Sequence, residues 1–285
     1  MGQLKWIGTA APAVLFAALA TGPAWGQVDL TGIWNPQLTE DQPERIPGPE
    51  LVDYAGLPIN DFARKWALSW SPDRLGLQEH QCQVHTAAYI YRGPLTLRIW
   101  EERDPETQAL IALHGYTSTY EQYRTIWMDR RPHPPEYAVH TWMGFSTGKW
   151  DGNILTVHTT HIKQGWHRRN GLPSSDKIDL IEHFILHGDS LTHVSIVTDP
   201  IYLSEPLIKS QDFNKVSNPN GGMLYPCEYV NELPGTDRAK VPAYLPGQNT
   251  FMDEYRTKFK LPLDAVLGGA ETMYPEYQEK LKTAK

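Results

Sequence analysis

Apolar and polar residues alternate through the middle of the chain, where eight short runs are either alternating or continuously apolar. Such runs, recurring roughly every ten residues with turn chemistry between them, are typical of a meandering antiparallel sheet. The turn-forming pairs are Asp104-Pro105, Asp151-Gly152 and Gly188-Asp189. We therefore predict strands over residues 95–102, 109–116, 119–128, 139–146, 153–163, 177–187, 190–199 and 205–213.

An open meander of this length would leave two unpaired edge strands, which favours closure of the sheet on itself. The predicted fold class is therefore all-β, a single antiparallel up-and-down barrel of about eight strands. A barrel of that size is wide enough to hold one small ligand.

The segments on either side of the predicted barrel core (95–215) have a different character. Residues 27–94 are rich in proline and glycine, with a short first strand at 29–34 and a helix at 59–70 that Asn60 would cap. Residues 216–285 contain glycine and proline breaks around two short helices, near 249–259 and 274–284. We expect both segments to wrap the barrel rather than to form domains of their own.

The first 26 residues read as a secretory signal peptide. Lys5 gives a positive start, residues 9–22 are apolar but too few to span a bilayer, and Ala24-Trp25-Gly26 supplies small residues before a cut at Gln27. An uncleaved N-terminal anchor is the alternative. Because no later segment approaches the roughly 18 apolar residues of a membrane helix, we expect a periplasmic or extracellular protein without membrane insertion.

Charge and cysteine content narrow the choice of partners and compartment. Without Lys5 the chain has 25 basic and 33 acidic residues, a formal net charge of −8, which argues against nucleic acid or an anionic membrane as a partner. The chain has two cysteines, Cys82 and Cys227, and an oxidising compartment favours a disulfide between them. Two unpaired buried thiols are the alternative.

Residues 144–148, Gly-Phe-Ser-Thr-Gly, match the G-x-S-x-G nucleophile elbow of serine hydrolases. That elbow needs a strand, a sharp turn and then a helix. Here the next residues form a hairpin turn that leads into another strand, so we reject a serine-hydrolase function.

Histidines suggest a metal site only weakly. His158 and His161 are three residues apart, a spacing that places them on opposite faces of a strand. A site assembled from His133, His140, His161 and His167 stays open as an alternative, but scattered histidines are more often solvated or hydrogen-bonded. We expect no metal and no cofactor.

The run at 177–187 is the most informative. Its even positions form an apolar face that Glu182 interrupts, and a carboxylate buried there needs a partner or a raised pKa. The run at 153–163 carries His161 and Lys163 on the same face as Leu155 and Val157. We therefore expect His161, Lys163 and Glu182 to face the barrel interior, and His158 to face outward.

The connecting loop brings further polar groups toward this end of the barrel, namely Arg168, Arg169, Asn170 and Asp176. Apolar walls with a few convergent titratable groups describe a small-molecule site. The alternative is a structural ion pair that plugs the barrel, between Glu182 and either Lys163 or Arg124.

A second candidate segment spans residues 123–137. Asp129 ends a strand, and the arginines and His133 that follow lie in a turn stiffened by prolines, which predicts a charged lip at the barrel mouth. A solvated and inert hairpin loop is the alternative. Trp142, further along, is a candidate stacking surface for a ligand.

Four segments together resemble a widespread class of secreted bacterial proteins: RTIWMDRRPHP, GFSTGKWDGNILTVHTTH, RRNGLPSSD and DPIYLSEP. Members carry Asp-Gly-Arg-Pro-His-Pro and then Gly-x-Ser-x-Gly-x-Trp-Glu-Gly-Asp-Thr-Leu-Val-Val, and the resemblance covers roughly residues 80–210. This chain departs in having Arg130 for glycine, Asp151 for Glu and Asn153 for Asp. The resemblance identifies relatives and implies no mechanism. Separately, Gly32-Ile33-Trp34 resembles the Gly-x-Trp start of lipocalin-like barrels, which implies binding of small hydrophobic molecules.

Two functions follow from these residues. One is a cofactor-independent lyase, isomerase or hydrolase in which Glu182 or His161 moves a proton and Asp176 orients a base. In that enzyme Lys163 and Arg169 would stabilise negative charge, and the substrate would also contact Asn170, Arg124, Asp129, His133 and Trp142. The alternative is a lipocalin-like carrier of a small apolar or aromatic ligand, in which the same cavity binds without chemistry.

Overall fold

The fold comes from a computed structural model of the chain. It describes residues 2, 28–37, 52–92, 95–218, 226–230 and 240–283. Apart from residue 2, the predicted signal peptide and its cleavage site lie outside the described residues.

In the described chain more residues lie in strands than in helices, and the strands follow one another as antiparallel hairpins over most of their length. Their bounds are β1 Gly32–Pro36, β2 Leu97–Arg103, β3 Leu110–Thr117, β4 Gln122–Trp127, β5 Phe145–Asp151, β6 Ile154–Thr160, β7 Gly165–Arg168, β8 Leu172–Ser174, β9 Asp179–His187, β10 Ser190–Thr198 and β11 Leu207–Val216. Nine of them close into a barrel in the order β1-β11-β10-β9-β6-β5-β4-β3-β2, while β7 and β8 form a separate hairpin. The prediction of an all-β fold with a closed barrel is confirmed.

The barrel differs from a purely up-and-down meander at one point. β4 and β5 pair in parallel, over Ile126 with Ser146 and Trp127 with Thr147. Of the strand predicted at 139–146, only the last two residues lie in β5. The connection between β4 and β5 contains Pro132, Pro134 and Pro135, which lack the N–H that a ladder requires. This connection forms no strand, apart from one parallel bridge between Thr141 and Ile162, and it returns along the barrel so that β5 runs in the same direction as β4.

The hairpin of β7 and β8 was missed, because residues 164–176 were predicted as loop. The turn of this hairpin contains Gly171 at φ +100, where a side chain would also meet the Trp70 ring. Trp166 packs edge-on against Trp70, with ring centroids 6.1 Å apart. The position of the hairpin is therefore fixed by packing against Trp70, the C-cap residue of helix α2 (Asp61–Ser69), and not by the polar sequence of the hairpin itself.

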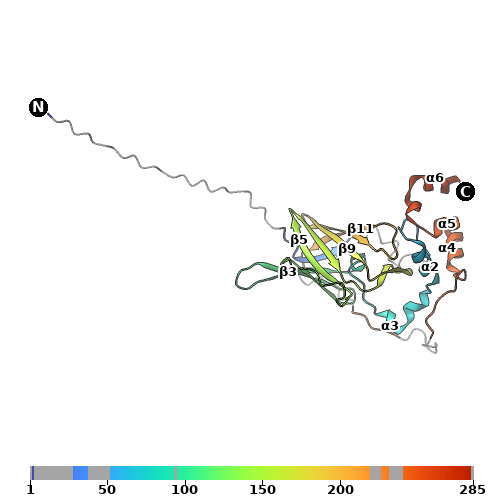
Figure 1. Ribbon diagram of the computed structural model, residues 1–285, viewed down its shortest axis with the longest axis horizontal. Helices are drawn as coiled ribbons and strands as arrows, with labels where there is room; N and C mark the ends of the chain where they lie inside the picture. Colours follow the sequence, from blue (N-terminus) through green and yellow to red (C-terminus); the bar gives the residue numbers. More distant parts are fainter. Residues whose placement is uncertain are drawn as a thin grey trace.

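The helices are short and lie toward one end of the barrel (Figure 1). Their bounds are α2 Asp61–Ser69, α3 Gln78–Gln81, α4 Phe251–Phe259, α5 Leu263–Val266 and α6 Pro275–Thr283, with 3-10 turns η1 Pro72–Gly76, η2 Ile90–Arg92 and η3 Ala270–Met273. The Asn60 side chain accepts a hydrogen bond from the Ala63 N–H, so the predicted cap of α2 is confirmed. Among the described residues, no helix is both long and apolar enough to cross a membrane.

The predicted disulfide is present. Cys82 at the end of α3 is bonded to Cys227, with a Cα–Cα distance of 5.6 Å. It ties residues 226–230 to α3, next to hydrogen bonds between Gln81 and Val230.

Buried apolar side chains form two clusters. One fills the barrel and includes Trp34, Leu97, Phe184 and Phe213. The other lies between the barrel end and α2, α5 and the segment before α2. Residues 86–92, which belong to no barrel strand, cover part of the barrel and send Tyr91 into the first cluster.

Candidate functional site

Glu182 faces the barrel interior, as its position in the sequence pattern predicted. Burial alternates along β9, and Leu180, Glu182 and Phe184 are all buried. The Glu182 side chain is 0 % exposed. A carboxylate in such a place is stable only when its hydrogen-bonding capacity is met.

Arg124 on β4 meets that need. Its Nη1 donates to Glu182 Oε1 at 2.9 Å, and its Nη2 pairs with Oε2. The Arg124 side chain is 3 % exposed, so the two-pronged ion pair is fully buried. The structural ion pair left open by the sequence is therefore the one between Glu182 and Arg124.

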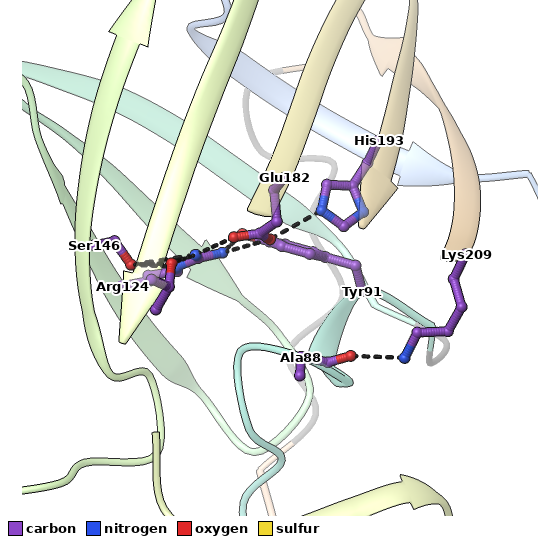
Figure 2. A network of polar contacts seen from close by, with 8 residues as sticks. Ala88, Tyr91, Arg124, Ser146, Glu182, His193 and Lys209 are labelled. Atoms are coloured by element: carbon purple, nitrogen blue, oxygen red, sulfur yellow. Dashed lines mark hydrogen bonds and ion pairs between the residues drawn. The ribbon is translucent and has the colours of Figure 1, made fainter. Parts of the chain in front are cut away.

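Neutral groups complete the network around the two charges (Figure 2). His193 Nε2 lies 2.9 Å from Glu182 Oε1, and the Tyr91 hydroxyl accepts from Arg124 Nη1 at 3.3 Å. Arg124 Nε donates to Ser146 Oγ at 3.2 Å, and its Nη2 donates to Thr159 Oγ1 at 2.8 Å. Each nitrogen of the guanidinium thus has a partner from the barrel wall or from the covering segment.

The electrostatics fix Glu182 in its ionised form. Burial alone would raise its pKa, but the charge of Arg124 and hydrogen bonds from Arg124 and His193 outweigh burial and hold the pKa at about 2. Burial lowers the pKa of His193, which stays neutral and donates to the carboxylate. A carboxylate held this way has no proton to give near neutral pH, and its pKa lies far from that of an effective general base.

A small apolar chamber lies beside the ion pair. Side chains of Leu97, Ile99, Leu113, Ile126, Leu155 and Phe184 surround it, with Leu30, Tyr91 and Arg124. The space among them is narrow, since the centre of a water molecule can occupy only about 10 Å³ of it. The chamber in this form holds about one water molecule.

His161 and Lys163 do not face the interior, and that expectation was wrong. β6 ends at Thr160, and His161 has a φ of +58, which breaks the alternation of faces. The His161 ring contacts Thr160 Oγ1 and the Pro135 carbonyl instead, and Lys163 is exposed with its Nζ 5.3 Å from the centre of the Trp142 ring. His158 faces outward as expected and pairs with Asp179.

The loop residues predicted at the barrel mouth do not converge on Glu182. Asp176 and Arg169 are exposed. Asn170 is buried and donates to the Asp53 carbonyl at 2.9 Å, which fixes the turn of the β7–β8 hairpin. The structure therefore does not bring these three residues together with the carboxylate.

Asp129 and His133 lie on the outer face of the barrel rather than at a lip. His133 sits between Thr160 Oγ1, 2.7 Å from its Nδ1, and Thr147 Oγ1, 2.8 Å from its Nε2. Asp129 accepts hydrogen bonds from Arg131. The connection between β4 and β5 is thus anchored across β5 and β6. Trp142 lies in the same connection, and its carbonyl accepts from the Ala87 N–H.

Of the four histidines left open as a metal site, three lie close together and His167 lies apart. The His140 and His161 ring centroids are 5.2 Å apart, and His133 and His161 both contact Thr160 Oγ1. His167 is buried against Asp199, with Nε2 2.9 Å from Oδ2, while His140 Nδ1 contacts the Ile162 carbonyl. The parts of the chain that the structure describes contain no group of three or more histidine, cysteine or acidic side chains placed to hold a metal ion.

Sequence reasoning missed several members of the buried network, namely His193, Tyr91, Ser146 and Thr159. His193 shares a buried face with Leu191 and Val197 on β10, so the periodicity that found Glu182 also marks it. Thr159 likewise shares a buried face with Leu155 and Val157 on β6. Tyr91 has no such signal, since it enters the barrel from a segment outside the sheet.

Ser146, the serine of the G-x-S-x-G match, is part of this network. It lies in β5, which turns directly into β6 with no helix between them. Its hydroxyl contacts Thr159 Oγ1 at 2.9 Å and Arg124, not a histidine. The context required for a nucleophile elbow is absent, in agreement with the sequence analysis.

Comparison with known proteins assigns the chain to no family. No family model and no curated protein matches the chain. Among solved structures, a secretory abundant heat soluble protein from Ramazzottius varieornatus is similar at 13% identity and a TM-score of 0.31, over 67% of this chain and 98% of that one. The fluorescent protein UnaG is similar at 7% identity and a TM-score of 0.28, over 66% and 97% of the two chains. Similarity at this level says nothing about function.

Proposed function

We propose that this protein binds a small, uncharged apolar or aromatic molecule inside its barrel and performs no chemistry on it. The observation that carries the proposal is an apolar chamber whose charged groups, Arg124 and Glu182, neutralise each other. Apolar walls with a few placed polar groups are the usual lining of a small-molecule site. A charged ligand would find no unpaired charge among them.

Gly115 is the residue that gives this chamber room to accept a ligand. It faces Arg124 across the β3–β4 ladder and lines the chamber. A Cβ built there would meet only Leu97 Cδ1, at 3.8 Å, which is ordinary van der Waals contact. The absence of a side chain therefore leaves this part of the wall open to a ligand ring once the chamber has widened.

The chamber must widen for a ligand to enter, and the covering segment 86–92 is the part that moves. Tyr91 contacts Phe184, Phe213 and the His193 ring, yet its segment belongs to none of the barrel ladders. Withdrawing Tyr91 breaks its hydrogen bond to Arg124, and moving the segment also strains the bonds from the Ala87 N–H to the Trp142 carbonyl and from Lys209 Nζ to the Ala88 carbonyl. Every strand pairing of the barrel stays intact. The withdrawal frees the space that the Tyr91 ring fills at the wall of the chamber.

The geometry gives less support to the enzyme, the first of the two functions that the sequence suggested. Glu182 is held ionised at the barrel centre, whereas His161 lies outside the barrel wall and Asp176 is exposed. General acid–base catalysis needs its groups within hydrogen-bond reach of one substrate. The three proposed catalytic residues do not meet that condition.

We also propose that the protein works outside the cytoplasm. The Cys82–Cys227 bond favours an oxidising compartment, and the N-terminal sequence pattern favours export. Fractionation of cells that express the full chain tests this: a shortened chain in the periplasm or medium is expected, and a full-length cytoplasmic chain would contradict it.

Native mass spectrometry of the purified protein, compared with the denatured protein, tests the binding function. We expect either a retained neutral organic molecule or, for an empty protein, saturable binding of the uncharged probe N-phenyl-1-naphthylamine measured by its fluorescence. The matched variants are Gly115→Ala, which the structure accommodates, and Gly115→Leu, which fills the chamber. Equal probe affinity for the wild type and Gly115→Leu would contradict the proposal.

A further inference from the structure

A second site lies on the outer face of the barrel, beside β5. The ladder between β4 and β5 ends at Trp127 and Thr147, while β5 continues to Asp151. From Gly148 onward, β5 has no strand partner on that side within the described residues. A groove of about 830 Å³ opens there, between β5, the outer face of β6 and the first residues of the β4–β5 connection.

The groove is basic. Arg130, Arg131 and Lys149 line it, and none of its lining residues is acidic. Arg131 is already neutralised, because it pairs with Asp129 and stacks on the Trp127 ring at 3.4 Å. Asp179 likewise pairs with His158 at the floor of the groove. Arg130 and Lys149, in contrast, form no ion pair with any described residue, so their charges are available to a ligand.

The position of Arg130 is conformationally costly. Its φ is +63, a left-handed conformation that glycine adopts freely and that other residues adopt rarely. The flanking contact fixes this turn, since Asp129 Oδ1 accepts from the Arg131 N–H at 3.2 Å. A non-glycine residue in such a strained conformation suggests that its side chain has a function.

The groove also has an apolar wall. Met128 and Trp150 line it, and both are half-buried against the barrel cluster. Its basic rim is held in place, because His133 anchors the connection to Thr147 and Thr160. The backbone that carries Arg130 is therefore held in place before a ligand binds.

From these contacts we propose that the groove binds a small aromatic anion, with its ring against Trp150 and Met128 and its acid group between Arg130 and Lys149. This site is separate from the barrel chamber: the two share no lining residue. Its ligand must carry a negative charge, whereas the chamber takes an uncharged one. The two proposals can therefore fail independently.

Calorimetric titration of the full chain with 1-naphthoate tests the site, with uncharged 1-naphthalenemethanol as the matched ligand. We expect saturable binding of naphthoate that weakens with added salt, and about tenfold weaker binding of the alcohol. Equal affinity for the two ligands, or no saturable binding of naphthoate, would overturn the proposal.

Two variants locate the binding. Arg130→Gly and Lys149→Gln should each raise the dissociation constant for naphthoate by about tenfold. Arg169→Gln, at an exposed arginine outside the groove, is the control and should leave it unchanged. Because Arg130→Gly removes the strain of the left-handed conformation, its thermal midpoint should be no lower than that of the wild type, and this measurement separates weaker binding from loss of folding. Unchanged affinity in both groove variants would contradict the assignment, as would loss of naphthoate binding in Gly115→Leu.

Discussion

Arg124 and Glu182 form a two-pronged ion pair at the centre of the barrel, although 58 residues separate them in the chain. They come from β4 and β9, which are not neighbours in the sheet. The pair therefore spans the two intervening strands β5 and β6, and its partners Ser146, Thr159 and His193 come from the strands between and beyond them. The network fixes the barrel centre and leaves the apolar chamber beside it without net charge.

Breaking this pair on one side should be costly. Glu182→Gln leaves Arg124 buried without its counter-charge, and we expect a loss of about 3–5 kcal/mol in the free energy of unfolding, measured by urea denaturation. The double variant Arg124→Met/Glu182→Leu should lose less than the sum of the two single changes. The exposed pair of Lys280 and Asp264 is the control, since Lys280→Met should cost less than about 1 kcal/mol. Additive losses at the buried pair would contradict the coupling.

Acid should destabilise the protein in two steps. His193 and His167 have pKa values that burial lowers from 6.5, so they stay neutral while the unfolded chain takes up protons, and stability should fall as the pH drops below about 6.5. The pKa of Glu182 falls from 4.5 to about 2, so its contribution is complete above pH 4.5 and is lost between pH 4.5 and 2. Denaturation midpoints measured across this range check both steps.

His193→Gln separates the two steps, because glutamine can still donate to Glu182 but does not titrate. The loss of stability between pH 6.5 and 4.5 should be smaller in this variant, while the lower step remains. A profile identical to that of the wild type would show that His193 does not contribute.

Part of this site could be read from the sequence and part could not. The period-two pattern placed Glu182 inside correctly, and the same pattern marks His193. The pattern failed at His161, because a non-glycine residue with a φ of +58 has no signature in the sequence. Tyr91 and the parallel pairing of β4 with β5 depend on how residues 86–92 and 128–144 cross the barrel, which local periodicity does not encode.

The disulfide should stabilise the attachment of residues 226–230 to α3. Cys82 and Cys227 are separated by 145 residues, for which chain entropy sets a gain of about 5 kcal/mol as an upper limit. The hydrogen bonds between Gln81 and Val230 also hold this segment, so we expect a smaller loss in the variant Cys82→Ser/Cys227→Ser. Thermal denaturation measures it, and an unchanged midpoint would contradict a stabilising role.

Relieving the left-handed conformation of Arg130 should stabilise the fold. We expect Arg130→Gly to raise the free energy of unfolding by about 1 kcal/mol. Lys260→Gly is the matched variant, since Lys260 caps α4 at a φ of +53 and does not line the groove. Both should be more stable than the wild type by urea denaturation, and only Arg130→Gly should bind naphthoate more weakly. A loss of stability in Arg130→Gly would mean that its side chain supports the fold.

The most direct test of the account is the affinity of N-phenyl-1-naphthylamine for the wild type, Gly115→Ala and Gly115→Leu, measured by fluorescence titration with the fold of each variant verified by circular dichroism. If the barrel chamber is the binding site, the added methyl group should weaken binding and leucine should abolish it, while all three proteins stay folded. Undiminished binding in a folded Gly115→Leu would show that the uncharged ligand binds elsewhere, and absence of saturable binding in a ligand-free wild type would contradict the proposed function.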